Sequence, residues 1–282
     1  MRDNAYVVAR NGYHMTISVA MINYNNERYI RKALDSIFSQ TRLPDEVVIS
    51  DDGSTDASLE IIQEFAERFG IIKLFKTPKN LGPSGNRNAA IRNCTSKFVI
   101  NIDSDDWFEP NVIACTYEML NDAPNSIVIS SFSVCPDESN VYTTIDTAYF
   151  CSLSQKDMIF YLASRQRNMP GNQMAFSMNT YQKIGGLNPD LRLYEDWDFM
   201  LRSLLHGVEW KHTGMVGYSY RKSGQGVSSA RQWRHHKYRC MIMFRSLLRG
   251  PWRFLLLRGY LNLFILKGWK YLRGTQSAIG YN

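Results

Sequence analysis

The sequence lacks an uninterrupted run of about 18 apolar residues, the length that a membrane-spanning helix needs. Its first residues, MRDNAYVVARNGYHMT, lack the apolar stretch of a signal peptide. Its five cysteines are odd in number, widely spaced and without a C-x-x-C pair. This pattern argues against a disulfide framework or a zinc site, and it predicts a protein of the reducing cytosol.

Acidic residues are missing from the end of the chain. All 26 lie in residues 1–209, together with 19 of the 33 basic residues, so this part carries a net charge of −7. The other 14 basic residues lie in residues 210–282. The two parts are therefore expected to have different electrostatic roles.

Apolar runs alternate with amphipathic segments through the first hundred residues. Strands are predicted at 16–23, 45–50, 71–76 and 97–103, with helices between them at 25–41, 57–70 and 84–94. Strands that alternate with helices of this length indicate βαβ units and a parallel sheet covered on both faces. We therefore predict an α/β fold. Further along the chain, strands are predicted at 126–134 and 141–150 and a helix at 156–166.

Polar clusters follow three of these strands: NYNNE, DDGSTD and DSDD. Ligands of open α/β sheets bind beyond the carboxyl ends of the strands, where these clusters are expected to converge. In the last cluster, Asp103 and Asp105 would share one face of an extended segment, whereas Asp106 would point elsewhere. Two such carboxylates suit Mg²⁺ or Mn²⁺, although for a lone D-x-D a plain turn before a helix is the favoured interpretation.

The loop at DDGSTD and the segment NLGPSGNRNAAI can likewise be interpreted either as ligand-binding or as purely structural. Asp51 and Asp52 could accept hydrogen bonds from a nucleotide, or they could belong to a helix-capping turn. The free N–H groups at the start of the helix containing Arg87 favour an anion, and the guanidinium suits phosphate. The alternative for Arg87 is a surface position on that helix.

Taken in order, NYNNERYI, DDGSTD, NLGPSGNRNAAI and FVINIDSDDWFEP resemble the family 2 glycosyltransferases of the GT-A fold, over residues 16–220. The resemblance implies a nucleotide-diphosphate-sugar donor, with UDP the favoured nucleotide, and Mn²⁺ or Mg²⁺ held by Asp103 and Asp105. It also implies a Rossmann-like, mostly parallel sheet flanked by helices. The residues it assigns to the nucleotide sugar are Asn25, Glu27, Asp51, Asp52, Arg87, Asp103 and Ser104.

A general base is expected in YEDWDFMLR, at the start of a predicted helix. The positive end of the helix favours ionised carboxylates there, although an acidic first turn needs no catalytic role. The family's usual base lies in an E-D pair at this place, so the resemblance assigns Asp196 as the base and Glu195 as acceptor-binding support. Trp197 could belong to the core or stack on a sugar ring.

The basic end of the chain interleaves Lys and Arg with aromatic and aliphatic residues. It predicts a helical, amphipathic region at 223–282 that lies on an anionic membrane surface rather than on nucleic acid, or else helices that cap the core. Residues 1–222 are predicted to form the catalytic domain, with 16–110 binding the nucleotide sugar and 111–222 the acceptor. The expected location is the cytoplasm, peripheral at the inner face of the plasma membrane.

The predicted activity is metal-dependent, inverting transfer of one sugar to a hydroxyl of a glycan or lipid-linked acceptor. A Q-x-x-R-W motif, carried by processive family members, is not matched by RQWRHHKYR, which favours single addition. The alternatives are a Mg²⁺-dependent phosphatase, a non-catalytic sugar-binding protein of the same fold, and retention instead of inversion.

Overall fold

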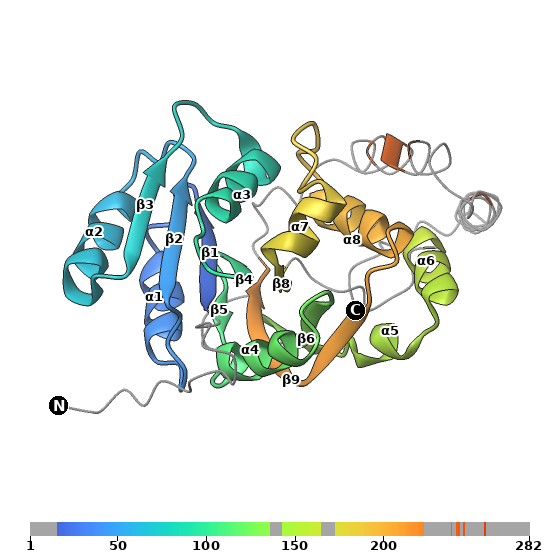
Figure 1. Ribbon diagram of the computed structural model, residues 1–282. Helices are drawn as coiled ribbons and strands as arrows, with labels where there is room; N and C mark the ends of the chain where they lie inside the picture. Colours follow the sequence, from blue (N-terminus) through green and yellow to red (C-terminus); the bar gives the residue numbers. More distant parts are fainter. Residues whose placement is uncertain are drawn as a thin grey trace.

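The computed structural model describes residues 16–135, 143–164 and 173–222, together with Tyr238, Met241, Ile242, Arg245 and Leu257. These residues form a central sheet flanked by helices (Figure 1). The strands are β1 (Ile17–Asn23), β2 (Glu46–Asp51), β3 (Ile72–Lys76), β4 (Phe98–Asp103), β5 (Trp107–Phe108), β6 (Ile127–Cys135), β7 (Thr143–Ile145), β8 (Ala175–Ser177) and β9 (Trp210–Arg221). The helices are α1 (Ile30–Phe38), α2 (Ser58–Phe69), α3 (Gly82–Arg92), α4 (Val112–Asp122), α5 (Ala148–Ser152), α6 (Gln155–Ser164), α7 (Met178–Ile184) and α8 (Glu195–Leu205).

The sheet has the strand order β3-β2-β1-β4-β8-β6-β9-β5, and β7 pairs with residues 132–134 of β6, beyond those that pair with β8. Strands β1 to β4 are parallel, as predicted, whereas β8 is antiparallel to both β4 and β6. The register pairs Asn23 with Asp51 and Ile22 with Asp103. The polar carboxyl ends of β1, β2 and β4 therefore lie next to one another at the same edge of the sheet.

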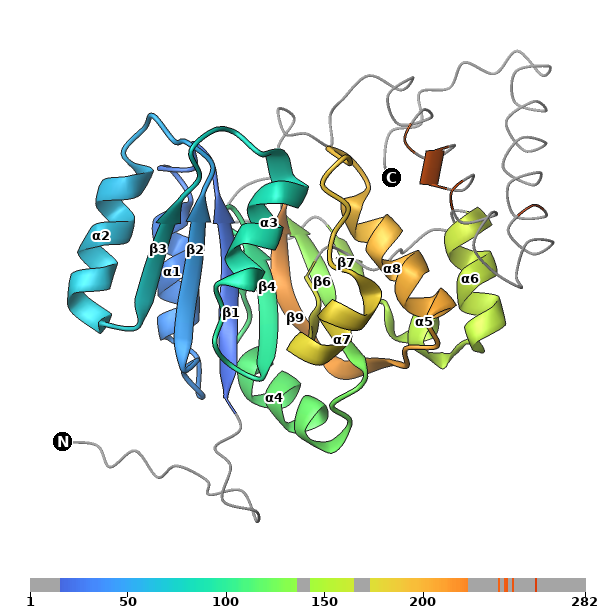
Figure 2. The ribbon, with the colours of Figure 1, turned by 45° about the horizontal axis from the view of Figure 1, so that its top comes forward.

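Both faces of the central strands β1, β2 and β4 are buried. Successive residues of β1 alternate between two hydrophobic clusters, with Val19 and Met21 in one and Ala20 in the other. Helices α1, α2 and α4 contribute to the first cluster, and α3, α6, α7 and α8 contribute to the second. Figure 2 shows α3, α7 and α8 on the same face of the sheet, which matters because the site draws on α3 and α8.

The predicted first half of the fold is confirmed, and the later part is confirmed only in places. The helix predicted at 156–166 and the strand predicted at 126–134 are found as α6 and β6. The segment 141–150 was predicted as one strand, which is wrong, because β7 ends at Ile145 and α5 begins at Ala148. The Oδ1 of Asp146 between them accepts a hydrogen bond from the Ala148 N–H, which closes a turn before the helix.

Most of the predicted C-terminal region lies outside the described residues. Of its few described side chains, Ile242 is 1% exposed in the cluster that includes Trp197. The Arg245 guanidinium lies 3.5 Å from the Asp190 carboxylate. Within the part of the chain that the structure describes, no helix has the length and apolarity to cross a bilayer.

Candidate active site

The site lies beyond the carboxyl ends of β1, β2 and β4. Helix α3 brings Arg87 to this edge, the start of α8 brings Glu195 and Asp196, and the end of β9 brings Arg221. The predicted convergence of the strand ends is therefore observed. For Arg221 the sequence favours a solvated loop over a contact with a diphosphate, whereas in the structure this side chain is buried at the same edge.

The loops after β1 and β2 are hydrogen-bonded to each other. Asn25, in the left-handed region with φ of 51°, accepts from the Thr55 N–H at 2.8 Å. The Glu27 carboxylate accepts from the Ala57 N–H at 2.8 Å, at the start of α2. Both side chains are exposed on the predicted nucleotide edge, and their hydrogen bonds fix the loop shapes there.

The carboxylate of Asp51 is directed into its own loop. It accepts from Asn23 Nδ2 at 2.8 Å, from the Ser54 hydroxyl at 2.5 Å and from the N–H groups of Gly53 and Ser54, and Asp51 is 1% exposed. With its oxygens already engaged, Asp51 shapes the turn after β2.

Asp52 occupies the start of α3. Its carboxylate accepts from the N–H groups of Leu81 at 2.7 Å and Gly82 at 2.9 Å, and from the Thr77 hydroxyl at 3.0 Å. The expectation that these helix N–H groups are free for an anion is therefore wrong, because a carboxylate 29 and 30 residues earlier in the chain already pairs with them. Asp52 itself is 3% exposed.

Arg87 is buried rather than on the surface of α3. It is 3% exposed, and its Nη2 lies 2.7 Å from Asp103 Oδ1. Burial alone lowers the pKa of Arg87, but the carboxylates of Asp103, Glu195 and Asp196 outweigh it and raise the pKa. Among the described residues, its Nη1 has no hydrogen-bond partner.

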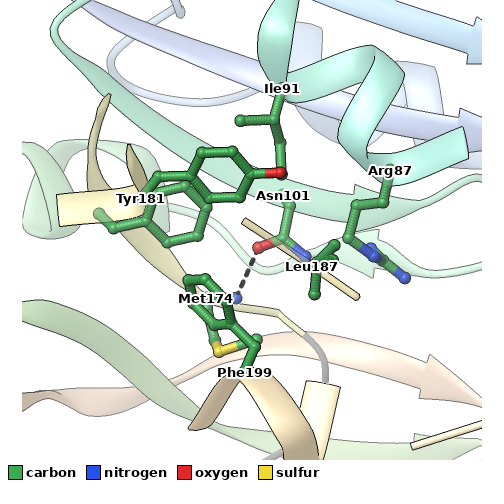
Figure 3. A pocket seen from close by; sticks show the side chains of 8 residues that line it. Arg87, Ile91, Asn101, Met174, Tyr181, Leu187 and Phe199 are labelled. Carbon is green, nitrogen blue, oxygen red and sulfur yellow. Dashed lines mark hydrogen bonds between the residues drawn. The ribbon is translucent and has the colours of Figure 1, made fainter. Parts of the chain in front are cut away.

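Behind Arg87 lies a cavity of about 10 Å³. Figure 3 shows Tyr181 and Phe199 as its aromatic walls and the hydrogen bond from the Met174 N–H to Asn101 Oδ1, 3.0 Å long. A space of this size holds one water molecule at most, so it is part of the core and cannot bind a sugar.

The D-x-D-D segment is a turn and not an extended strand. Strand β4 ends at Asp103, and the Asp106 N–H donates to the Asp103 carbonyl at 3.1 Å. Asp103 pairs with Arg87, whereas Asp105 Oδ2 lies 2.7 Å from Nη2 of Arg221. The expected alternation along an extended chain is therefore wrong, and the two carboxylates meet different arginines.

The remaining residues of this turn are buried. Ser104 is fully buried, and its hydroxyl accepts from Asn26 Nδ2 at 2.7 Å, so its predicted contact with the donor is not available in this arrangement. Asp106 is 1% exposed and accepts from the Arg221 N–H at 2.9 Å. Burial and the charges of neighbouring aspartates raise the pKa of both Asp105 and Asp106.

Helix α8 begins with the acidic pair that the sequence singled out. The preceding residue, Tyr194, has φ of 64°, an uncommon conformation for a bulky residue that directs the chain into the helix. Asp196 is half-buried, and its Oδ1 accepts from the Trp197 N–H at 2.7 Å. The helix start was expected to favour ionisation, yet burial raises the pKa of Asp196.

Other residues of this helix are structural. Trp197 is 6% exposed and donates its Nε1–H to the Leu162 carbonyl at 3.2 Å, which makes it a core residue and not a sugar platform. Asp198 pairs with Arg202 at 2.7 Å, and that guanidinium also donates to the carbonyls of Ile184 and Gly186. This network fixes α8 against the end of α7.

The pH dependence of stability should report on Glu195. Burial and the charge of Asp196 raise the pKa of Glu195 from 4.5 to about 7, so between these pH values the folded protein keeps a proton that the unfolded chain has lost. Stability therefore falls as pH rises from 4.5 to 7. Glu195→Gln should raise the free energy of unfolding at pH 8 by about 1–3 kcal/mol and change it little at pH 4.5. Urea unfolding in chelator at both pH values measures this, and an equal effect at both would contradict it.

The donor atoms suit a divalent cation. Five carboxylates lie close enough to interact electrostatically: those of Asp103, Asp105, Asp106, Glu195 and Asp196. Two positive side chains, Arg87 and Arg221, pair with them among the described residues, too few to balance five negative charges. Hard oxygen donors with excess negative charge fit Mg²⁺ or Mn²⁺. In the described part of the chain, no three acidic, histidine or cysteine side chains form a ready-made cage, so ligands from substrate or water would complete the shell.

Histidine does not add to this group among the described residues. His212 lies on β9, where its Nε2 is 3.0 Å from the Ser131 hydroxyl and its Nδ1 accepts from the Gly214 N–H. His235 and His236 lie outside the described residues.

Sequence reasoning passed over two aromatic residues. Tyr24 directly follows β1 and is 50% exposed, although the strand itself is almost entirely buried. Tyr29 lies under Arg221, whose Cζ is 3.7 Å from the ring centroid. The position of Tyr24 at a strand end is a signal that the sequence offers. The stacking of Arg221 on Tyr29 joins residues 192 positions apart, and no local sequence pattern indicates it.

The family model described as Glycosyl transferase family 2 matches residues 18–185, more than half of the chain. The chain belongs to glycosyltransferase family 2. Glycosyltransferase GlyA of Streptococcus pneumoniae serotype 4 is 39% identical over 116 residues, which make up 41% of this chain and 16% of GlyA. The Escherichia coli UDP-Gal:alpha-D-GlcNAc-diphosphoundecaprenol beta-1,3-galactosyltransferase is 28% identical over 192 residues, 67% of this chain and 68% of that enzyme.

Solved structures agree on the fold of this glycosyltransferase. S. aureus TarS 1-349 in complex with UDP has a TM-score of 0.68 at 19% identity, over 88% of this chain and 71% of TarS. Mannosyltransferase PcManGT from Pyrobaculum calidifontis, in complex with GDP-Man and Mn²⁺, has a TM-score of 0.63 at 18% identity, over 91% of this chain and 72% of that one. The predicted GT-A architecture is thereby confirmed, and the C-terminal basic region stays outside the comparison.

Proposed function

We propose that this family 2 glycosyltransferase moves one sugar, with inversion, from a nucleotide-diphosphate donor to a hydroxyl of a glycan or lipid-linked acceptor in the synthesis of a bacterial surface polysaccharide. The observation that supports this most is the meeting of Asp103, Glu195 and Asp196 around the buried Arg87, with Asp105 two residues further along the same turn and paired with Arg221. Groups for donor, cation and acceptor thus share one edge of the sheet.

The donor nucleotide is assigned to the edge formed by the loops after β1 and β2. There, the exposed ring of Tyr24 offers a face on which a base can stack, and Asn25 and Glu27 border the same edge. Asp52 is assigned to the base, and this role requires its carboxylate to exchange a backbone N–H for a base N–H. UDP is our favoured nucleotide because the TarS structure contains it.

Asp103 and Asp105 are assigned to the divalent cation. When bound, such a cation would neutralise the charge of the departing nucleoside diphosphate. Arg87 contributes a fixed positive charge behind Asp103 and holds this carboxylate in place. The PcManGT structure, which contains Mn²⁺, makes Mn²⁺ the natural probe.

Asp196 is assigned as the general base. Inverting transfer needs a group that accepts the proton of the acceptor hydroxyl as this oxygen attacks the anomeric carbon. Asp196 is half-buried and so more open than Glu195, which is 9% exposed. A raised pKa makes a carboxylate a stronger base once it is ionised, and both members of the pair have one.

A lipid-linked acceptor and a peripheral position at the inner membrane surface are part of the proposal. The E. coli relative is by name an enzyme acting on a diphosphoundecaprenol-linked sugar. Residues 210–282 carry 14 basic residues and no acidic one, which suits an anionic surface.

The deciding experiment is calorimetric titration of the protein with UDP, GDP, CDP and TDP, with and without Mn²⁺. We expect one nucleotide to bind, and its binding to be lost in chelator. Asp105→Ala should weaken the Mn²⁺-dependent part of that binding at least about tenfold, because it removes one of two cation ligands. Asp122→Ala, at the exposed end of α4, is the control and should bind as wild type does.

Two results would count against the proposal. Tight, Mn²⁺-dependent nucleotide binding by Asp105→Ala would contradict the cation assignment. Failure of wild type to bind any of the four nucleotides with Mn²⁺ present would contradict the donor site.

A further inference from the structure

The guanidinium of Arg221 occupies one side of the cation site. Its Nη2 lies 2.7 Å from Asp105 Oδ2, and its Cζ lies 3.7 Å from the centroid of the Tyr29 ring. The side chain is 9% exposed. A positive charge buried against a carboxylate offsets the attraction that this carboxylate would have for a metal ion.

The backbone of Arg221 is fixed while its side chain is incompletely bonded. The Arg221 N–H donates to Asp106 Oδ1 at 2.9 Å, and the next N–H, of Lys222, donates to the Cys135 carbonyl at 2.9 Å. The Nε of Arg221, however, is buried without a hydrogen-bond partner among the described residues. The pair with Asp105 therefore uses only Nη2 of the Nε–Nη2 edge, which can hold two oxygens side by side.

Arg87 is not equivalent to Arg221, although it also pairs with an aspartate of this turn. Arg87 lies inside α3, is 3% exposed and interacts with three carboxylates, Asp103, Glu195 and Asp196. It would leave all three unbalanced if it moved. Among the described residues, the Arg221 guanidinium pairs with the carboxylate of Asp105 alone. Arg221 also lies at the end of a strand, so its side chain can be exchanged at smaller cost.

We propose that Arg221 is an internal counter-cation that competes with a divalent cation for Asp105 until a diphosphate draws the guanidinium away. The proposal rests on the proposed function, since it requires a nucleoside diphosphate at this edge. A phosphate group engages both Nε and Nη2, which the pair with Asp105 does not. Metal and nucleotide therefore bind cooperatively, and each strengthens the binding of the other by the same factor.

The test is the affinity for Mn²⁺ alone, measured by electron paramagnetic resonance of free Mn²⁺ with no nucleotide present. Arg221→Gln should bind Mn²⁺ at least about fivefold more tightly than wild type, because the competing charge is gone. The same variant at saturating Mn²⁺ should bind UDP, or GDP if wild type prefers it, about tenfold more weakly. A purely structural role for Arg221 would weaken both, so the opposite signs are diagnostic.

Two variants serve as controls. Arg31→Gln removes an arginine from an exposed pair with Glu64 and should leave both affinities unchanged. Arg221→Lys keeps the charge and should bind Mn²⁺ within about twofold of wild type, and it also provides a conservative variant if Arg221→Gln folds poorly. Thermal unfolding of each variant reports whether it folds.

Mn²⁺ affinity of Arg221→Gln that equals or falls below that of wild type would overturn the proposal, as would tighter Mn²⁺ binding by Arg221→Lys. These outcomes are separate from failure of the proposed function. In that case wild type binds no nucleotide at any Mn²⁺ concentration, and the comparison in Mn²⁺ alone still decides whether Arg221 competes for the cation.

Discussion

Asp196→Asn is expected to lower the rate of sugar transfer by about 10²–10⁴-fold and to leave nucleotide binding within about twofold of wild type. Asparagine retains the oxygen that accepts from the Trp197 N–H, so the start of α8 should keep its shape. It loses only the capacity to take up a proton. The loss should therefore fall on the chemical step and not on the affinity for the donor.

The measurement is release of nucleoside diphosphate from UDP- and GDP-sugars, with water and with a panel of oligosaccharides as acceptors. Asp157→Asn is the matched control, since Asp157 also lies in the first turn of a helix, α6, and is exposed. It should retain full activity. Transfer by Asp196→Asn within about tenfold of wild type would contradict the assignment and would turn attention to Glu195.

The parallel half of the fold was predictable because each local signal agreed with the others. In β1, a mostly apolar run with β-branched residues ends at Asn23, and Gly70 ends α2 in the left-handed conformation expected of a helix end. The later half was harder because its strands pair over long separations. β8 is three residues long and is a strand only because it joins β4 to β6.

The residues of the site could be predicted from the sequence, but the contacts between their side chains could not. The sequence brought Arg87, Asp103, Asp105 and Asp196 to one edge, because strand ends and helix starts meet there. It did not reveal that Asp52 already caps α3, since this contact depends on the path of the chain between β3 and α3. Nor did it reveal that each metal-directed aspartate has its own arginine.

Buried charge explains why these pairs matter more than the motif alone suggests. Two carboxylates in a turn repel one another, and burial raises the pKa of Asp105 and Asp106. In the described structure the arginines reduce this repulsion without removing it. A site that keeps an excess of negative charge is prepared for a further cation, at the expense of the stability of the fold.

The effect of these buried charges on the stability of the fold can be measured by replacing Arg87. Arg87→Met should lower the free energy of unfolding by about 3–5 kcal/mol at pH 8, because removing one partner of a buried pair leaves the other charge uncompensated. Three carboxylates, Asp103, Glu195 and Asp196, lose their common counter-charge. Arg31→Met, at an exposed ion pair, is the control, and its free energy of unfolding should equal that of wild type.

The pH dependence separates lost charge from lost packing. Without Arg87 the already raised pKa values of Glu195 and Asp196 should rise further. The folded protein then takes up protons as the pH falls, and the loss of stability should shrink between pH 8 and pH 5. Arg87→Met combined with Asp103→Asn should recover about 1–2 kcal/mol of the loss at pH 8, since one unpaired carboxylate is gone. Urea unfolding of the single and double variants at both pH values measures these differences. A loss that is the same at pH 5 and pH 8, and is not relieved by Asp103→Asn, would mean that Arg87 fills space in the core and does not balance charge.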